Sequence, residues 1–417
     1  MKVTLINTKQ SGGGAAIAAQ RLHKALCEQG VDATLIVAEG EGGECVEVLS
    51  KTLWGKIRYK IAFLFERLGI WLTNRFSRKN LFTVSTALFG ADIANLKAIK
   101  EADIIHLHWV NQGMVSLKGI ESLVATGKPI VITPHDMWYA TAICHHAGEC
   151  NRYTTGCKDC PYLATPSDND LAAKVWQKKQ NLYKHNVTFI AISNWMLQRL
   201  NRSALTSINP KEVICNVMDT NTFCPHSKEV CRQRLGILPT EKVLAFGAAK
   251  LNDPIKGADM LFKAIEESGE KENLLLLLFG AIKGDEEFLQ QIPCRYIYVG
   301  EQLDKEQLAQ LYSAADVVVV PSHYESLSLV IAEAMACGTP AVSFNNAGQT
   351  MLIDHKENGY LAEYPSTQDF ANGINWILQN SDEKIRECAM AKIESIMSPQ
   401  KVALQHIELY KRLLNQE

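Results

Sequence analysis

Two glutamates in the second half of the chain stand eight residues apart within the segment 321–340, which reads PSHYESLSLVIAEAMACGTP. The pattern predicts that a strand ends at the start of this segment, that Glu325 lies in the following loop, and that a helix begins near Ser328 and contains Glu333. The unpaired amides at such a helix start, around Ser328 and Leu329, suit a phosphate or diphosphate. Glu333, more than a turn further on, can accept hydrogen bonds from sugar hydroxyls. A chain with 45 acidic residues holds several such pairs, so the ordinary alternative is a solvated helix face.

Two lysines and one histidine also follow predicted strands. Lys250 and Lys256 lie in the loop AAKLNDPIKG after the strand 243–247, where a cation can neutralise a diphosphate as negative charge moves onto it. His135 stands in TPHDMW, directly after a strand that ends at Thr133. A histidine in that place can hydrogen-bond a sugar hydroxyl or a departing group. The alternatives are surface lysines and a structural histidine.

A glycine turn, Ser11 followed by three glycines, connects the first strand to the first helix. It does not complete the Gly-x-Gly-x-x-Gly pattern, so dinucleotide binding is poorly supported. Gly13 and Gly14 nevertheless permit the backbone to approach a ligand closely. The alternative is a tight strand-to-helix turn with no ligand.

Four of the twelve cysteines fall within seventeen residues, together with His145 and His146. The four are Cys144, Cys150, Cys157 and Cys160. They can form a four-thiolate structural zinc site, although only one Cys-x-x-Cys pair is present. Free buried thiols and a disulfide are the alternatives.

The segment 51–80 carries eight Lys or Arg against one acidic residue, interleaved with aromatic side chains. A basic amphipathic helix of this kind can lie in an anionic membrane interface. A helix packed on its own domain is the alternative. Nucleic acid also favours such a composition, but nothing else in the chain supports that partner.

The overall composition narrows the class of protein. The chain has 417 residues, 47% of them hydrophobic and 21% charged, with a net charge of −2, which is typical of a globular protein. Near-neutrality argues against a protein that mainly clamps nucleic-acid phosphates. We find no stretch of about 18 apolar residues and no signal peptide, so we expect a cytoplasmic protein with reduced thiols.

Short apolar runs alternate with helical patterns in two series, which predicts two doubly wound α/β units with parallel sheets. The first series has strands near 3–7, 33–37, 103–108, 129–133 and 188–192, and the second near 243–247, 274–280, 296–300, 316–322 and 341–344. We predict an N-terminal domain 1–215, a C-terminal domain 216–398, and a helix 399–417 that packs back on the N-terminal domain. Ligands of such folds bind at the carboxyl ends of strands, so we expect the chemistry in a cleft between the domains.

The segment 321–340 resembles the family-four retaining glycosyltransferases of GT-B fold. Their Glu-x7-Glu and following Ala-Met-Ala-Cys-Gly-Thr-Pro stand here as Glu325, Glu333 and residues 334–340. The likeness extends over essentially the whole chain, through the glycine turn and the segments 193–195, 216–223, 256–257 and 358–360. It implies two Rossmann-like doubly wound domains facing a cleft.

The resemblance also implies roles for the site residues. Glu333 would hold the ribose of a nucleotide-diphosphate sugar donor, Glu325 would contact the donor sugar, and His135 would lie in the active site. No cofactor would be required for catalysis. The family's usual Arg after the strand glycine is Ala248 here, and the loop 326–328 reads Ser-Leu-Ser in place of Gly-Phe-Gly. Lys250 or Lys256 would then have to supply the positive charge alone.

The implied function is that of a retaining glycosyltransferase acting on a glycan or lipid-linked acceptor, in cell-surface polysaccharide synthesis. It would be cytoplasmic or peripheral at the inner face of the membrane. A nucleotide-sugar 2-epimerase of the same architecture and a non-catalytic GT-B scaffold or binding protein are the alternatives.

Overall fold

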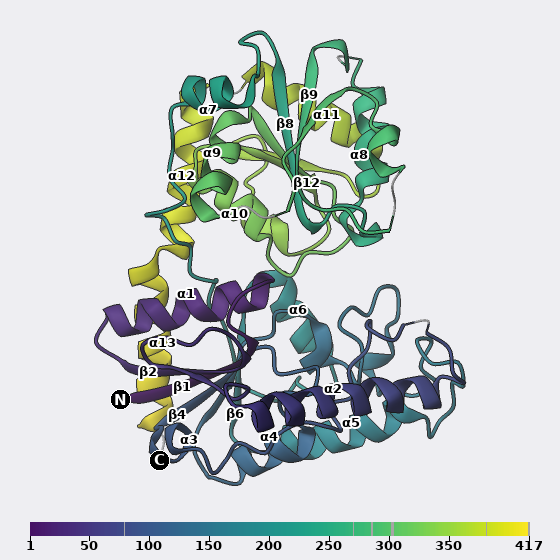
Figure 1. Ribbon diagram of the computed structural model, residues 1–417, viewed down its shortest axis with the longest axis vertical. Coiled ribbons are helices and arrows are strands. Elements are labelled where there is room, and N and C mark those ends of the chain that lie inside the picture. The colour runs from purple at the N-terminus through teal and green to yellow at the C-terminus, as the bar shows by residue number, and fades with distance from the viewer. Residues whose placement is uncertain (79, 270, 285–286, 302–303, 381, 416–417) are drawn as a thin grey trace. The chain divides into compact units, whose positions relative to one another are not determined.

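The computed structural model describes residues 1–415 except 79, 270, 285, 286, 302, 303 and 381. The chain divides into two compact units (Figure 1). Unit 1 comprises Met1–Val217 together with the chain from Gln400 onward, and unit 2 comprises Met218–Pro399. The predicted boundary after residue 215 lies close to the observed one.

Unit 1 is built on a seven-stranded parallel sheet with the order β3-β2-β1-β4-β5-β6-β7. The strands are β1 Lys2–Lys9, β2 Asp32–Glu39, β3 Val46–Val48, β4 Ile104–Leu107, β5 Ile130–Ile132, β6 Val187–Ala191 and β7 Lys211–Val213. Strands β4, β5 and β6 are buried along their whole length, as expected of parallel strands covered on both faces. The strand order reverses between β1 and β4.

Helices cover this sheet. They are α1 Gly14–Glu28, α2 Leu53–Thr73, α3 Lys97–Glu101, α4 Leu117–Val124, α5 Leu171–Leu182, α6 Asn194–Arg202 and α13 Pro399–Leu414. Two short 3₁₀ turns, η1 Met137–Ala140 and η2 Arg152–Thr154, interrupt the segment between β5 and α5. Helices α1 and α13 share one core with the strands, because Leu22 and Tyr410 pack into the cluster that contains Leu5 and Leu35. The C-terminal helix thus belongs to the core of unit 1.

Unit 2 is a six-stranded parallel sheet with the order β10-β9-β8-β11-β12-β13. Its strands are β8 Lys242–Lys250, β9 Leu274–Ala281, β10 Arg295–Tyr298, β11 Val317–Val320, β12 Ala341–Phe344 and β13 Gly359–Ala362. Its α-helices are α7 Lys228–Leu235, α8 Ala258–Glu267, α9 Lys305–Ala314, α10 Leu329–Ala336, α11 Thr367–Asn380 and α12 Glu383–Met397. Short 3₁₀ turns are η3 Pro254–Lys256, η4 Lys271–Asn273, η5 Phe288–Gln291 and η6 Gly348–Met351. Helices α8 and α11 pack on one face of this sheet.

The predicted α/β class with two doubly wound units is confirmed, and every predicted strand is present within a few residues of its predicted bounds. Three strands escaped prediction, namely β3, β7 and β13, which have three or four residues each and lie at sheet edges. Such short segments carry too little periodicity to be told from loops. Among the described residues, no helix has the length and apolar character needed to cross a bilayer.

Candidate active site

The predicted donor residues of unit 2 gather where its strand order reverses. Strands β8 and β11 are neighbours there. After β8 the chain continues to β9 on one side, and after β11 it continues to β12 on the other side. Ligands of doubly wound sheets bind at this position, outside the carboxyl ends of the strands. Lys256 comes from the segment after β8, and Glu325 from the loop after β11.

The structure joins these two side chains in an ion pair. The Nζ atom of Lys256 lies 2.8 Å from Oε1 of Glu325. The Lys256 side chain is 30% exposed and that of Glu325 is 14% exposed. Burial disfavours the charged ammonium, but the charge of Glu325 and its hydrogen bond outweigh burial and raise the pKa of Lys256. The lysine is therefore a cation at neutral pH.

A glycine allows the two loops to meet. Gly257 has a φ of +70°, and a Cβ atom there would lie 2.1 Å from the carbonyl oxygen of Pro321. No other residue fits such an approach without a backbone shift. The His323 amide also donates to the carbonyl of Ile255 at 2.9 Å. The fold thus sets the position of Lys256 against the loop that carries Glu325.

Lys250 precedes Lys256 in the chain, and Ser328 and Leu329 follow Glu325. Lys250 is the last residue of β8, is half-buried, and forms no ion pair with any residue that the structure describes. Helix α10 begins at Leu329, and the Ser328 hydroxyl caps it by accepting from the Ile331 amide at 3.4 Å. Its first turn contains no acidic side chain. The leading amides of α10 are therefore available to an anion.

Glu333 does not lie on a solvated helix face. It is 6% exposed, and its Oε2 accepts from the Tyr312 hydroxyl at 3.3 Å. The ordinary alternative for the Glu-x7-Glu pair therefore does not hold for its second member. Across the loop, the Gly348 amide donates to the Glu325 carbonyl at 2.7 Å, and a Cβ at Gly348 would lie 1.9 Å from the Ser326 oxygen. This contact secures the loop between Glu325 and α10.

In unit 1 the glycine turn follows β1, beside the reversal of strand order between β1 and β4. Gly13 is the N-cap of α1 with a φ of +102°, and no side chain caps the helix. Gly13 and Gly14 are exposed, and a Cβ added at Gly13 would meet no atom within 4 Å. The first amides of α1 therefore have no side-chain cap, and ligand binding at this turn stays a prediction.

His135 lies just beyond β5 and is half-buried. Its Nε2 lies 3.0 Å from Nδ1 of His108, and the two rings stack with centroids 5.3 Å apart. Burial lowers the pKa of His135 to about 4, an effect that the nearby Asp136 partly opposes. His135 is therefore a neutral imidazole at pH 7, able to exchange a hydrogen bond with a ligand but carrying no charge of its own.

The adjacent aspartate has other partners. Asp136 Oδ2 accepts from Trp109 Nε1 at 2.8 Å and lies 2.7 Å from His145 Nδ1, and its Oδ1 accepts from the Trp138 amide at 2.8 Å. Burial raises the pKa of Asp136, but the charge and hydrogen bonds of His145 and the Trp138 amide outweigh burial and lower the pKa to about 2. His145, expected only as a member of the Cys-rich loop, is a structural partner of this carboxylate.

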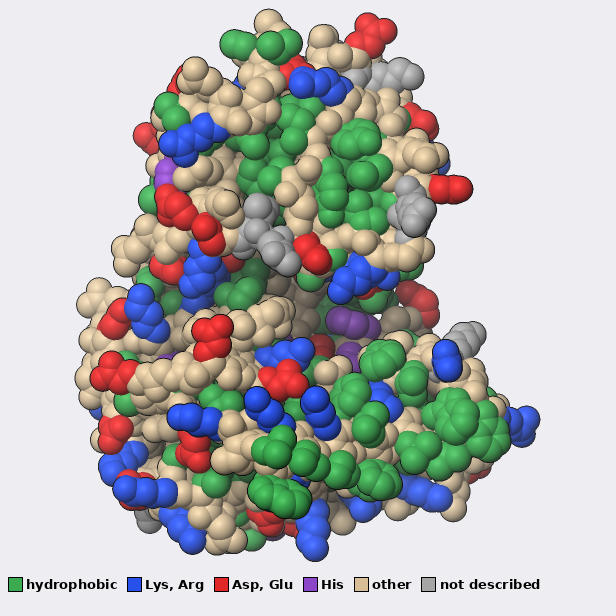
Figure 2. Space-filling model, in the orientation of Figure 1, with side chains coloured by type: hydrophobic (Ala, Val, Ile, Leu, Met, Phe, Trp, Pro, Cys, Tyr) green, Lys and Arg blue, Asp and Glu red, His purple; other side chains and the backbone are tan. Residues whose placement is uncertain are grey.

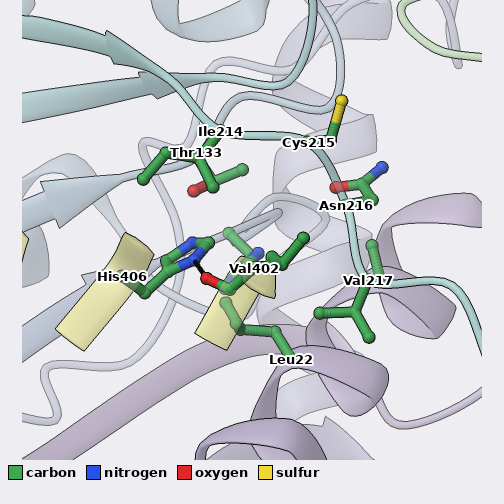
Figure 3. A pocket seen from close by; sticks show the side chains of 10 residues that line it. Leu22, Thr133, Ile214, Cys215, Asn216, Val217, Val402 and His406 are labelled. Carbon is green, nitrogen blue, oxygen red and sulfur yellow. Dashed lines mark hydrogen bonds between the residues drawn. The ribbon is translucent and has the colours of Figure 1, made fainter. Parts of the chain in front are cut away.

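Sequence reasoning missed His108. It follows β4, which ends beside the β5 strand that leads to His135, so the side-by-side pairing of these strands brings the rings together. The sequence signal that could have identified it is the pair His106 and His108, which stand two residues apart at the end of an apolar run. A small pocket beside His108 is also lined by Thr133, Asn216 and His406, together with apolar side chains (Figure 3).

The Cys-rich loop (residues 144–160) contains no disulfide, because all twelve cysteines are free thiols. Cys144 and Cys160 are buried, and Cys150 and Cys157 are half-buried. Within the described part of the chain, no three or more His, Cys, Asp or Glu side chains are arranged to hold a metal ion. The side-chain geometry thus gives the predicted zinc site no support, and that site stays a prediction.

Comparison with known proteins agrees with this geometry. The Glycosyltransferase Family 4 model matches residues 12–222, just over half of the chain, and the model of glycosyl transferases group 1 matches residues 228–393. A D-inositol 3-phosphate glycosyltransferase of Mycobacteroides abscessus is 33% identical over 171 residues, which are 39% of this chain and 37% of that protein. One of Xylanimonas cellulosilytica is 32% identical over 190 residues, or 43% and 45% of the two chains. The matches thus span less than half of the length of these curated relatives.

Solved structures share the fold over the whole length of both chains. Sucrose-phosphate synthase of Thermosynechococcus elongatus superposes with a TM-score of 0.68 at 19% identity and covers 100% of each chain. HepE of Anabaena, solved in complex with UDP and glucose, superposes with a TM-score of 0.63 at 19% identity and covers 99% of this chain and 100% of its own. With two doubly wound units, the Glu-x7-Glu loop and these matches, the chain belongs to glycosyltransferase family 4 and carries a glycosyl transferases group 1 domain.

Proposed function

We propose that this protein is a retaining glycosyltransferase that moves a sugar from a nucleotide-diphosphate sugar to a hydroxyl of a glycan or lipid-linked acceptor. The observation that carries the proposal is the Lys256–Glu325 ion pair at the strand reversal of unit 2. The α10 amides and the buried Glu333 follow Glu325 in the chain. A cation and open helix amides suit a diphosphate. Carboxylates suit sugar hydroxyls.

The donor roles follow from these positions. The α10 amides at Ser328 and Leu329, with Lys256 and Lys250, hold the diphosphate. Glu333 accepts from the ribose hydroxyls, and Glu325 contacts the sugar. Solved structures of the same fold support a nucleotide donor, since HepE of Anabaena has been solved with UDP-glucose. Gly13 and Gly14 of unit 1 offer backbone amides to the donor phosphate or the acceptor.

The proposed reaction is a front-face substitution. The bond between the anomeric carbon and the diphosphate oxygen breaks, the acceptor oxygen bonds to the same face of that carbon, and the acceptor proton passes to the departing diphosphate. Lys256 stabilises the charge that develops on this leaving group. The neutral His135 orients a sugar hydroxyl, and the enzyme otherwise contributes positioning. We propose that this reaction requires no cofactor.

The experiment begins with ligand binding. A thermal-shift panel of UDP, GDP and their sugar conjugates identifies the donor, since a ligand that binds the folded state raises its melting temperature. The matching donor is then incubated with the protein alone, and release of free sugar is followed by NMR. We expect slow release with retained anomeric configuration, lost in Glu333→Gln and in Lys256→Met. Lys263→Met, which changes an exposed lysine of α8 in the same unit, is the matched control.

Three other outcomes would contradict all or part of the proposal. Interconversion of the donor sugar without release would identify a 2-epimerase. No shift with any nucleotide would identify a scaffold or binding protein, an alternative raised by Ala248 and by the altered loop 326–328. Initial release with inverted configuration would refute the retaining mechanism while leaving a transferase.

We further propose that the protein works in cell-surface polysaccharide synthesis, in the cytoplasm or at the inner face of the membrane. This part of the proposal rests on the chemistry of a lipid-linked acceptor, which remains at a bilayer surface. Transfer assays with lipid-linked and water-soluble acceptors test it, and exclusive use of a water-soluble acceptor would contradict it.

A further inference from the structure

Helix α2 (Leu53–Thr73) turns its apolar face away from the protein. Six aliphatic side chains follow one another at spacings of four, four, three, four and four residues, which places them on one stripe of an α-helix. They are Leu53, Ile57, Ile61, Leu64, Leu68 and Leu72, and all of them are exposed. Trp54 is 81% exposed and Phe65 is 50% exposed at the border of the same stripe. Helix α2 does pack on its own domain, as in the alternative expectation, but it does so through Glu66, Arg67 and Ile70 and leaves this stripe uncovered.

The side that α2 turns toward the protein contains a buried ion pair. Glu66 is fully buried and its Oε1 accepts from the backbone amides of Thr86 and Ala87 at 2.8 and 3.0 Å. The Arg67 guanidinium lies 3.4 Å from that carboxylate and donates to the Val84 carbonyl at 3.2 Å. These bonds fix the rotation of α2 about its axis, so the apolar stripe cannot turn inward without leaving a buried charge unpaired.

Aromatic side chains extend the exposed apolar surface beyond the helix. Phe76, Phe82 and Phe89 are each at least 40% exposed, and Phe89 stacks on Phe65 with centroids 5.7 Å apart. We call these residues, the six aliphatic side chains and Trp54 the α2 face. Figure 2 shows the resulting apolar patch over α2.

Basic side chains flank the α2 face. Lys56 and Lys60 lie four residues apart along one edge of the stripe, and Arg58 lies on the other edge, all three exposed. Arg75 and Arg78 follow the helix and are exposed as well. The one acidic residue of the segment 51–80 is Glu66, which is buried against Arg67. The exposed charges of this segment are therefore all positive.

We infer that the α2 face is a membrane-docking surface, which inserts its apolar side chains into the interface of a bilayer containing anionic lipids. An apolar stripe with basic flanks is the arrangement that lies in a bilayer interface, where lysines and arginines reach the headgroups while the apolar side chains enter the acyl boundary. A second copy of the chain fits less well, because a symmetric contact would bring two sets of positive charges together. The inference deepens the membrane location in the proposed function by naming the surface that would bind lipid, and it can be tested separately because lipid binding needs neither donor nor acceptor.

The first test measures partitioning of the full-length protein onto sucrose-loaded vesicles. We expect binding to phosphatidylcholine vesicles with 30% phosphatidylglycerol and little binding without it. Leu64→Ser/Phe65→Ser should lower the partition coefficient by at least about tenfold. Its matched control is Leu404→Ser, which removes an exposed leucine of α13 in the same unit. An unchanged partition coefficient in the double variant would overturn the inference.

The second test separates insertion from adsorption by charge. Lys56→Gln/Arg58→Gln/Lys60→Gln should also lower the partition coefficient by at least about tenfold, whereas removing three exposed charges elsewhere in unit 1, at Lys24, Lys97 and Lys411, should change it by less than about threefold. Insertion should let brominated phosphatidylcholine quench the fluorescence of the wild-type protein, and Trp54→Phe should remove most of that quenching. Charge-dependent binding without quenching from Trp54 would refute insertion.

A third measurement tests whether a second copy of the chain, and not a membrane, covers the α2 face. Sedimentation velocity without lipid should show a monomer whose sedimentation coefficient does not change in Leu64→Ser/Phe65→Ser. A dimer that this variant abolishes would assign the α2 face to a second copy and overturn the inference. The donor-induced thermal shift and donor hydrolysis of the same variant report on the proposed function separately, and we expect both to be unchanged. A failure of lipid binding is therefore distinguishable from a failure of the transferase proposal.

Discussion

Because Lys256 and Glu325 form an ion pair, we expect substitutions of the two residues to have opposite effects on the affinity for a nucleoside diphosphate. The Lys256 ammonium lies 2.8 Å from the Glu325 carboxylate, with which a bound diphosphate would have to compete for the lysine. Glu325→Gln keeps the shape of the side chain and removes its charge. We therefore expect this variant to bind a nucleoside diphosphate more tightly than the wild type does, while its turnover of the sugar conjugate falls because the sugar contact is impaired.

The magnitudes follow from the exposure of the pair. With Lys256 30% exposed, water screens the attraction, and a pair of this kind contributes roughly 0.2–1 kcal/mol. Release of the lysine should then tighten binding by about 1.4- to 5-fold, since each 1.4 kcal/mol is tenfold in affinity. Lys256→Met instead removes a charge-assisted hydrogen bond to phosphate, worth roughly 1.5–3 kcal/mol, and should weaken binding by about 10- to 150-fold. The sign of the change distinguishes the two variants.

Isothermal titration calorimetry with UDP and GDP at low salt measures both effects, and the Glu325→Gln difference should shrink as salt is raised. Lys263→Met on the exposed side of α8 serves as the control and should change nothing. If Glu325→Gln weakens binding by tenfold or more, the carboxylate positions Lys256 or contacts the nucleotide, and it does not compete with the diphosphate for Lys256. If Lys256→Met binds as the wild type does, the diphosphate does not lie at this strand reversal.

Other predictions concern stability and metal content. Gly257→Ala would place a Cβ 2.1 Å from a backbone oxygen at a φ of +70°, so the free energy of unfolding should fall by roughly 1–3 kcal/mol in urea titrations; an unchanged midpoint would contradict the close approach. Glu66→Ala leaves two buried amides without their acceptor and a buried arginine without its carboxylate partner, and should cost roughly 3–5 kcal/mol. Glu66→Gln keeps an acceptor and should cost clearly less, and equal losses would refute this account. Burial lowers the pKa of both His135 and His406 from 6.5 to about 4, so the unfolded chain binds more protons in that window. Stability should be full above about pH 6.5 and fall by up to roughly 1.4 kcal/mol per pH unit for each histidine as the pH drops toward 4. Melting temperatures of the wild type and His406→Gln between pH 7.5 and 5 test this, and equal slopes would refute it. If the Cys-rich loop binds zinc, protein purified without chelator should hold about one equivalent, and less than about 0.2 equivalents would contradict the site.

Much of the candidate site could be predicted because its residues follow one another in a short segment. Glu325, Ser328 and Glu333 lie within nine residues, and the capped helix start and the strand before them have local signals. The contact between Lys256 and Glu325 had no such signal, since the two residues are 69 positions apart and meet only because β8 and β11 are neighbours in the sheet. The pairing of His108 with His135 depends in the same way on β4 lying beside β5.

The amino-acid sequence by itself determined the α/β class, the two series of strands and the loops that carry the predicted donor residues, because apolar runs, glycine turns and helix starts are local patterns. The tertiary structure decided which side of each element faces inward. For α2 the sequence showed an amphipathic basic helix but not its rotation about its axis. The bonds from Glu66 and Arg67 to the backbone at 84–87 hold the side with Glu66, Arg67 and Ile70 inward and leave the leucines outward. Such a choice depends on partners distant from the helix in the sequence, and no local periodicity encodes it.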